Sequence, residues 1–322
     1  MLGVALMWGC APSEGGSTAG GTAAGGGSGD LTIAVIPKGT THAFWKSVQA
    51  GAESAGKELG AKVIWKGPLK EDDRAGQIGI VQQFAADKVS AIVLAPLDEQ
   101  ALVAPVQAAN AKGVPVVIID SALKGEAGKD FVSLVATDNR RAGELGGERL
   151  AKLLGEKGKV VLLRYMEGSA STMAREAGFL DAIKKYPGIQ VISDRSYAGA
   201  TQAEAQTKAM QMVDTLREAN GIFTPNESST LGMVQALEKN GLTGKLKFVG
   251  FDASSELVEA LKGGKVDALV AQNPVKMGYE GVKAAIEKVK GKTVGPAVDT
   301  GVTVIDKDNL ESSAVQKLLA GK

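Results

Sequence analysis

The chain has 322 residues, which is enough for two domains of ordinary size. Lysine and arginine number 37 against 36 acidic residues, so the net charge of +1 offers no basic surplus for a nucleic-acid backbone. One cysteine and one histidine exclude a disulfide framework and a cysteine-cluster metal site, and they leave little room for histidine-based catalysis. We therefore expect a globular protein that binds no nucleic acid and uses neither a metal nor another cofactor.

Residues 1–30 differ in composition from the rest of the chain. A short apolar run, MLGVALMWGC, ends at Cys10, and 8 of the next 19 residues are glycine, as in a flexible linker. This arrangement resembles a bacterial lipoprotein signal, which implies that Cys10 is lipidated. It departs from that pattern because Trp8 lies close to the cysteine and no Lys or Arg precedes the run. The alternative is a disordered tail with an incidental cysteine.

Residues 31–60 form the first regular unit: a buried strand (Leu31–Ile36), a polar loop and a helix. Trp45 lies about 100° around this helix from Phe44, off the apolar stripe. In open α/β sheets, ligands bind beyond the carboxyl ends of the strands, so this aromatic pair is placed either to contact a ligand or to cap the core. The stripe that we expect to pack on a sheet consists of Phe44, Val48, Ala52, Ala55 and Leu59.

Strands and helices then alternate as far as residue 137. The continuous apolar strands are typical of strands buried on both faces, and the alternation predicts a parallel, doubly wound sheet. Asp138 is expected to cap the next helix, whereas Asp120 precedes a loop and is free to face a ligand. The expected strands are Lys62–Trp65, Ala91–Ala95, Val114–Ile119 and Phe131–Ala136, with helices at Ala75–Lys88 and Glu99–Ala111.

Residues 138–322 repeat this α/β pattern. Three polar side chains, Asn226, Asp252 and Gln272, each follow a strand. Arg175 is expected in the first turn of a helix, where a cation opposes the helix dipole, so it is either a solvated arginine or a group with another use. The expected strands are Val160–Leu163, Ile189–Ile192 and residues 222–224, 247–252, 267–271 and 300–305, and the helices include Ser171–Tyr186, Gln202–Glu218 and Val275–Lys290.

Seven short motifs, in this order, carry a family resemblance: HAFW, VVIIDS, ATDN, MAREAGF, TPNESSTLG, VGFDAS and LVAQNP. Over about residues 31–310 the chain resembles periplasmic sugar-binding proteins of the ribose-binding type, which are type I solute-binding proteins of ABC transporters. The resemblance implies an α/β fold of two similar doubly wound parallel-sheet domains joined by a three-strand hinge. The implied domains are residues 31–137 with 273–300 and residues 138–272 with 301–322, preceded by the signal and linker of residues 1–30.

The resemblance also implies a ligand site between the domains. Phe44 and Trp45 match the aromatic residues that sandwich a sugar ring, and the family's hydroxyl-binding side chains match Asp120, Arg175, Asn226, Asp252 and Gln272. His42, Ser121, Asn139 and Met166 complete the predicted ligand-binding set. His42 stands where ribose binders often have asparagine, Ser121 where they have arginine, and Ala200 where an aromatic is expected. These departures leave a polyol, another pentose, a hexose or a furanosyl signal molecule open.

The implied function is capture of a small sugar or polyol for an ABC permease and its ATPase, by a periplasmic or otherwise extracytoplasmic monomer. Such a protein would touch the membrane only through a lipid anchor. One alternative is a sensor component for a chemoreceptor or sensor kinase. Another is a regulator core of the lac-repressor type, although residues 1–30 are too short and glycine-rich to form a DNA-binding domain. The sequence contains no Walker-type loop, no GxSxG elbow and no histidine-based constellation, so we do not expect an enzyme.

Overall fold

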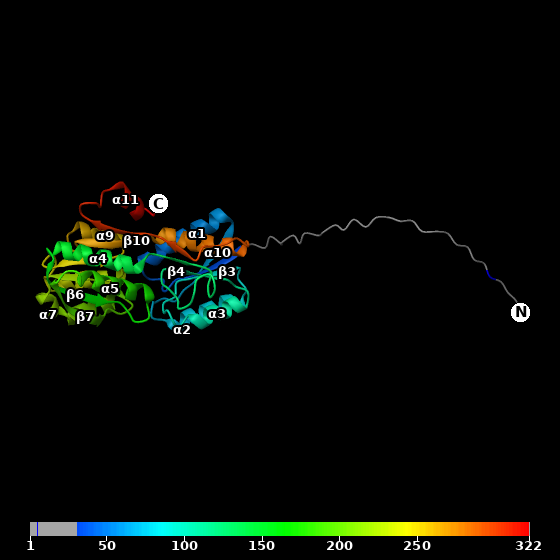
Figure 1. Cartoon of the computed structure of the whole chain (residues 1–322), viewed down its shortest axis with the longest axis horizontal. Coiled ribbons are helices and arrows are strands. Elements are labelled where there is room, and N and C mark those ends of the chain that lie inside the picture. Colours follow the sequence, from blue (N-terminus) through cyan, green and yellow to red (C-terminus); the bar gives the residue numbers. More distant parts are fainter. Residues whose placement is uncertain (1–4, 6–30, 322) are drawn as a thin grey trace.

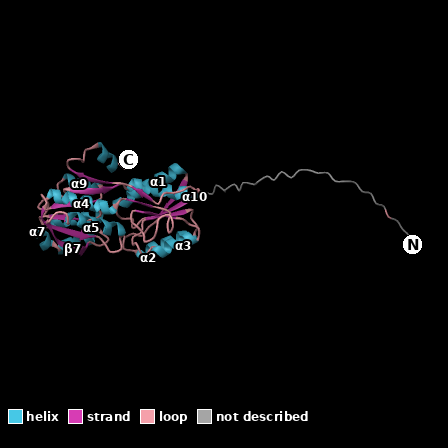
Figure 2. Cartoon of the chain, viewed as in Figure 1, coloured by secondary structure: helices cyan, strands magenta, loops and turns pink. Residues whose placement is uncertain are grey.

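The computed structural model describes residue 5 and residues 31–321, so the predicted signal, the linker and Cys10 lie outside the described part of the chain. Two lobes lie side by side, each built on one six-stranded sheet (Figure 1). Helices pack on the strands of each lobe (Figure 2). We call these the first and the second lobe.

The first lobe contains a wholly parallel sheet. Its strands, in pairing order, are β11 (Ala297–Asp299), β5 (Leu134–Ala136), β4 (Val116–Ile119), β3 (Ala91–Leu94), β1 (Leu31–Ile36) and β2 (Ala61–Trp65). Its helices are α1 (Ala43–Leu59), α2 (Arg74–Ala86), α3 (Val103–Ala111) and α10 (Pro274–Val289). Every residue of β3 and β4 is buried, as expected for a continuous apolar strand between two helical layers.

The second lobe repeats this plan, except that its edge strand β12 runs antiparallel to β10. Its strands, in pairing order, are β12 (Val302–Asp306), β10 (Ala268–Gln272), β9 (Lys247–Phe251), β8 (Gly221–Phe223), β6 (Lys157–Arg164) and β7 (Gly188–Tyr197). Its helices are α4 (Asn139–Leu153), α5 (Ala170–Ile183), α6 (Gln202–Gln211), α7 (Val213–Glu218), α8 (Glu227–Lys239), α9 (Ser255–Lys262) and α11 (Ser313–Leu319). The two sheets confirm the predicted fold class.

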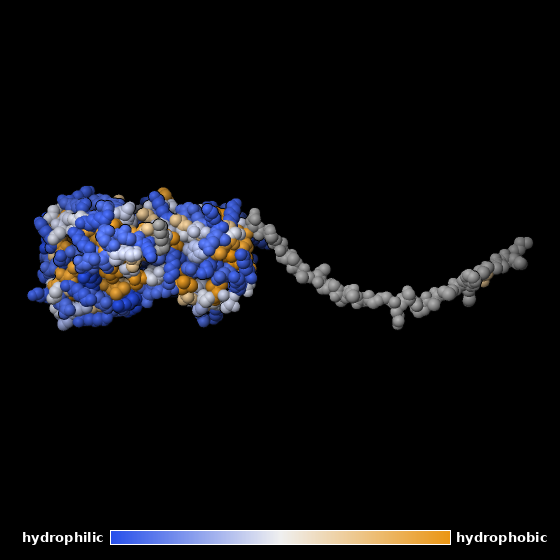
Figure 3. Space-filling model, turned by 90° about the horizontal axis from the view of Figure 1, so that it is seen from above, coloured by the Kyte–Doolittle hydropathy of each residue, from blue (hydrophilic) through white to orange (hydrophobic). Residues whose placement is uncertain are grey.

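The chain passes between the sheets three times: from β5 to β6, from β10 to β11 and from β11 to β12. Helix α10 follows β10 of the second sheet but packs on α1 and on strands of the first sheet. Helix α11 lies at the top of Figure 1 near the junction of the lobes. Seen from that side, the surface is mainly hydrophilic with scattered hydrophobic patches (Figure 3).

Glycines permit close crossings of the main helix pair in each lobe. A Cβ atom at Gly51 of α1 would collide with the carbonyl of Val275, at the start of α10. In the second lobe, a Cβ atom at Gly143 of α4 would likewise collide with the carbonyl of Arg175 on α5. These glycines therefore set how closely α1 approaches α10 and how closely α4 approaches α5, the helix that carries Arg175.

Several expected boundaries differ from the structure. The single helix expected over 202–218 is divided at Met212 into α6 and α7. Strand β7 continues to Tyr197 because it pairs with the whole of the long strand β6. The sequence pattern did not indicate the short strand β11 or helix α11. Within the described residues, no helix is both long and apolar enough to cross a membrane.

Candidate functional site

The carboxyl ends of strands from both lobes meet around a small buried cavity. Lys38 and Asp120 come from the ends of β1 and β4, and Asp252 and Gln272 come from the ends of β9 and β10. Eight predicted ligand-binding residues line this cavity: His42, Phe44, Trp45, Asp120, Arg175, Asn226, Asp252 and Gln272. It is also lined by residues that the sequence analysis did not identify: Lys38, Glu71, Ser171, Thr172 and Glu227.

The cavity has a volume of about 30 Å³. A space of roughly 10–15 Å³ is needed for one water molecule, so in this arrangement the lobes are closed too tightly for a sugar ring. A ligand of that size therefore requires the lobes or the lining side chains to move apart.

The two strand-ending acids occupy equivalent places in the two lobes and share an unusual backbone conformation. Asp120 has φ of 62° and Asp252 has φ of 71°, both in the left-handed region. Residues other than glycine seldom adopt this conformation, and when held there by the surrounding structure they cluster at binding sites. Each strand thus turns sharply at its acid, and both carboxyl groups line the cavity.

In the first lobe, Asp120 is paired with a lysine. Its Oδ2 lies 2.7 Å from Nζ of Lys38, and both side chains are almost completely buried. The same ammonium donates to Oγ of Ser171 in the second lobe at 2.9 Å. Ser121 adds a second link between the lobes, because its Oγ accepts a hydrogen bond from the Ser171 amide at 3.0 Å. The Lys38–Asp120 pair therefore joins the predicted sugar-binding acid to the facing lobe.

A second ion pair in the first lobe involves the only histidine. His42 Nδ1 lies 2.8 Å from Oε1 of Glu71, which also accepts a hydrogen bond from the Trp45 indole at 2.7 Å. Tyr165 of the second lobe donates its hydroxyl to the other Glu71 oxygen at 2.9 Å. Glu71 is thus bonded by three side chains, one of them from across the junction.

The electrostatics keep both members of this pair charged. Burial alone would lower the pKa of His42, but the adjacent Glu71 carboxylate outweighs it and raises the pKa to about 9. Burial would likewise raise the pKa of Glu71, but His42, Lys38 and the Trp45 N–H lower it to about 2. At neutral pH the pair is therefore a buried imidazolium–carboxylate.

In the second lobe, Asp252 is held by uncharged donors. Its Oδ1 accepts from Nε2 of Gln272 at 2.7 Å, and its Oδ2 accepts from the Glu227 amide at 2.8 Å. Burial raises the pKa of Asp252 to about 6, although Arg175 and the Gln272 amide favour the ionised form. Asp252 is thus ionised at neutral pH and takes up a proton under mildly acidic conditions.

Arg175 reaches the cavity as a partly bonded guanidinium. Its Nε donates to Asn139 at 2.8 Å, its Nη1 donates to the Pro225 carbonyl at 2.9 Å, and its Cζ lies 3.9 Å from the ring centre of Phe251. Because α5 begins at Ala170, Arg175 lies in the second turn, and the expected first-turn position is wrong.

Two buried polar atoms in the cavity lining have no hydrogen-bond partner among the described residues. They are Nη2 of Arg175, a donor, and Oε1 of Gln272, an acceptor. Buried polar groups in folded proteins are nearly always paired, so each unpaired atom calls for an explanation. A ligand hydroxyl can accept from the first atom or donate to the second.

The aromatic pair lies at the start of α1, as expected, but in a different orientation. Trp45 is 2% exposed and packs in the core of the first lobe, whereas Phe44 is only partly buried. Their rings meet edge to face with centroids 5.0 Å apart. Phe44 packs against the same core, as expected, but the expectation that Trp45 lies off the packed stripe is wrong, because the bond to buried Glu71 holds the indole inside. Both rings nevertheless line the cavity.

Glu227 caps a helix of the opposite lobe. Its two carboxylate oxygens accept hydrogen bonds from the amides of Ala43 at 3.0 Å and Phe44 at 2.9 Å, at the start of α1. Helix α1 receives no side-chain cap from His42 and has no acidic residue in its first turn. The cap that satisfies these amides is thus supplied across the junction.

Three predicted ligand-binding residues do not line the cavity. Asn139 donates to the Asp120 carbonyl at 3.1 Å and accepts from Arg175 at 2.8 Å, and Ser121 accepts a hydrogen bond from the amide of Ser171, the second residue of α5. Met166 lines a separate open cavity on the surface, beside Arg74. Within the described residues, no cluster of three or more His, Cys, Asp or Glu side chains is suited to hold a metal ion.

A family model described as a periplasmic binding protein domain matches residues 33–293. The chain belongs to this family. It is 31% identical over 267 residues to a D-ribose/D-allose-binding protein of Pseudomonas aeruginosa, a match that covers 81% of this chain and 83% of that protein. It is 30% identical over 268 residues to the D-allose-binding periplasmic protein of Escherichia coli, with coverages of 82% and 86%.

Solved structures of periplasmic binding proteins share the architecture. The structure of a carbohydrate transporter solute-binding protein from Agrobacterium radiobacter in complex with D-arabinose superposes with a TM-score of 0.86 and 36% identity, covering 90% of this chain and 99% of that one. The family resemblance inferred from the seven motifs is confirmed.

Proposed function

We propose that the protein captures a small sugar or polyol between its two lobes outside the cytoplasm and delivers it to an ABC permease with its ATPase. The observation that carries this proposal is the pair of unpaired buried atoms, Arg175 Nη2 and Gln272 Oε1, in a cavity also lined by four acidic side chains and two aromatic rings. Membership of the family and relatives that bind D-ribose, D-allose and D-arabinose support it.

The chemistry of the lining suits a polyhydroxy ligand. Flat aromatic surfaces at Phe44 and Trp45 cover the apolar C–H face of a sugar ring, while the hydroxyl edge bonds to carboxylates, amides and a guanidinium. Hydrogen bonds to ionised groups are the stronger ones, and a hydroxyl that is misplaced in an epimer leaves them unpaired. Such a site reaches roughly micromolar affinity, about −8 kcal/mol.

In this proposal, the three chain passages between the sheets form the hinge between the lobes. The ligand contacts both lobes and therefore stabilises the closed arrangement, which the permease recognises. The protein acts without catalysis, as a monomer, and Cys10 is its lipid anchor to the membrane.

The direct test is a thermal-shift screen of the full chain with D-ribose, D-allose, D-arabinose, D-fucose, D-tagatose and a set of linear and cyclic polyols. We expect at least one compound to raise the melting temperature, followed by a saturable heat of binding in calorimetry. If no compound shifts the melting temperature and mass spectrometry finds no small molecule released on denaturation, the sugar-binding function is refuted.

A further inference from the structure

A second cavity adjoins the sugar cavity beneath α11 and is about ten times larger. Its volume is about 320 Å³ against about 30 Å³. We propose that this space, here called the outer subsite, receives the substituent of a substituted sugar, so that the ligand class is a glycoside rather than only a free monosaccharide. This inference rests on the proposed function, because the sugar ring itself is placed in the central cavity.

The two cavities share part of their lining. Phe44, Glu227, Asp252 and Gln272 line both of them. Gln272, whose Oε1 has no hydrogen-bond partner among the described residues, therefore belongs to the wall shared by the ring position and the outer subsite. A group attached to the ring would extend past this wall, while a neighbouring ring hydroxyl donates to that oxygen.

Part of this wall is assembled by closure. Glu227 belongs to the second lobe, and its carboxylate is held by the Ala43 and Phe44 amides of the first. These bonds join the two lobes, so separating the lobes removes the partition. A substituent can thus be seated before the lobes close around it.

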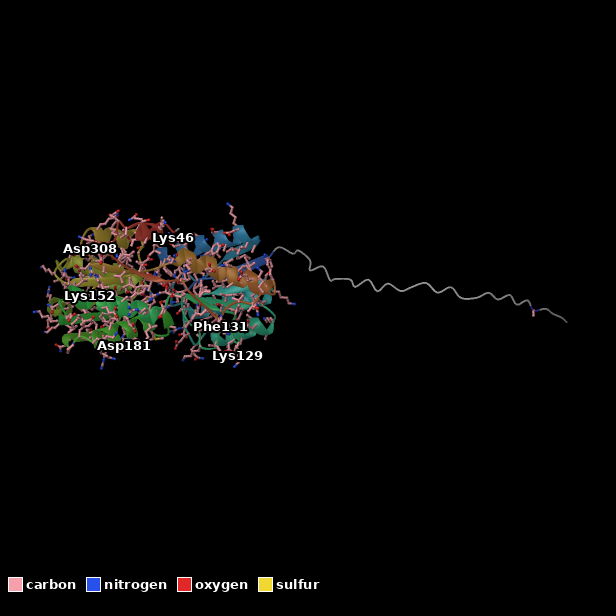
Figure 4. All side chains as sticks on the ribbon, turned by 45° about the horizontal axis from the view of Figure 1, so that its top comes forward. Lys46, Lys129, Phe131, Lys152, Asp181 and Asp308 are labelled. Carbon is pink, nitrogen blue, oxygen red and sulfur yellow. The ribbon has the colours of Figure 1, made fainter. Side chains whose placement is uncertain are left out.

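The lining of the outer subsite combines hydroxyls with apolar surface. Ser47, Ser254 and Ser255 contribute hydroxyls, and Pro274, Leu318 and Leu319 contribute apolar side chains. Lys46 of α1, labelled in Figure 4, adds a positively charged side chain to this lining. Polar groups that fix orientation, set in a partly apolar wall, are typical of small-molecule sites, whose volumes are roughly 300–1,000 Å³.

Both lobes contribute to this subsite. Its first-lobe residues come from the starts of α1 and α10, and its second-lobe residues come from the starts of α8 and α9, the ends of β9 and β10 and the end of α11. The chain beyond α11 reaches the first lobe, since a Cβ atom at Gly321 would lie 3.1 Å from the Val275 side chain. A substituent in this space therefore contacts both lobes and favours closure, as the sugar ring does.

The test compares free sugars with their glycosides on a matched pair of variants. D-ribose, D-allose and D-arabinose are each titrated calorimetrically as the free sugar, the methyl glycoside and the phenyl glycoside. Ser255→Trp places a large side chain in the outer subsite. Ser313→Trp is the control, because Ser313 is also an exposed serine at the first position of a helix but does not line this cavity.

For at least one of these sugars, we expect a glycoside to bind the unmodified protein at least as tightly as the free sugar. Ser255→Trp should weaken that glycoside by about tenfold or more, about 1.4 kcal/mol, while changing the affinity for the free sugar by less than about threefold. Ser313→Trp should change neither affinity. Binding of the free sugars with every glycoside excluded, or equal losses for both ligand types in Ser255→Trp, overturns the outer subsite and leaves the proposed function intact. Absence of binding by every sugar and every glycoside overturns both.

Discussion

The two lobes present their charges to the site in different ways. In the first lobe each buried charge has a charged partner: Lys38 pairs with Asp120 and His42 with Glu71. In the second lobe the lining groups are bonded mainly by neutral groups, and Arg175 and Gln272 each retain an atom without a partner among the described residues.

This difference suggests a division of labour. A buried ion pair is already satisfied and gains little from a ligand, but breaking it leaves an uncompensated charge. An unpaired buried donor or acceptor gains a bond only when a ligand arrives. We therefore expect first-lobe substitutions to act mainly on stability and second-lobe substitutions to act mainly on affinity.

The largest effect is expected for Lys38→Met in the first lobe. This substitution removes the charged partner of Asp120 and leaves its carboxylate buried beside an apolar side chain. The free energy of unfolding should therefore fall by about 3–5 kcal/mol. Denaturant titration measures this, with exposed Lys112→Met as the control. A loss below about 1 kcal/mol would show that the pair contributes no more than a surface ion pair.

In the second lobe, Arg175→Met should reduce affinity by about 100-fold, because hydrogen bonds to a charged group contribute roughly 1.5–3 kcal/mol each. Calorimetry with the sugar identified in the thermal-shift screen measures the loss. Arg217→Met removes an exposed arginine from α7 and should leave affinity unchanged. Near-normal affinity in Arg175→Met would remove the main support for the proposed division of labour.

A smaller effect is expected for Glu227→Ala, which removes the cap that the second lobe supplies to α1. Loss of a helix cap costs roughly 0.5–2 kcal/mol of stability. Because this cap joins the lobes, its loss should lower the closed fraction, that is, the fraction of molecules whose lobes are closed. Fluorescence energy transfer between labels on the two lobes reports that fraction without ligand. Glu227→Gln retains an acceptor oxygen, so its closed fraction should lie between those of the unmodified protein and Glu227→Ala. An unchanged distance distribution in Glu227→Ala would mean that this contact does not control closure.

The smallest effect is a pH dependence that originates in the second lobe. The pKa of Asp252 is raised to about 6, and in the proposed function ligand hydroxyls donate to its ionised form, so binding should lower this pKa and release a proton. Affinity should therefore fall as the pH drops from 7 to 5, by about tenfold at most. Calorimetry in buffers of different ionisation enthalpy measures the released proton. Proton uptake on binding at pH 6 would contradict this assignment.

Much of the lining of the candidate site was predictable because it comes from the ends of strands. Asp120, Asp252 and Gln272 directly follow or end buried strands, and such positions converge at one edge of a parallel sheet. Lys38 follows β1 in the same way, so its position was a signal that could have identified it. Glu71 lies in an irregular loop after β2 and has no periodic pattern to mark it. Its place in the site depends on contacts with His42, Trp45 and Tyr165, which lie in other segments of the chain.

The sequence by itself determined the alternation of apolar strands and helices, and hence two parallel sheets, because hydrophobic periodicity is a local property. It also placed most of the polar ligand-binding candidates at strand ends. Only the tertiary structure decided which groups are already paired, which atoms remain free, that Trp45 faces inward and that Glu227 caps the opposite lobe. These features depend on contacts between segments far apart in the chain. Burial and pairing are set by the meeting of the lobes, which no local pattern specifies.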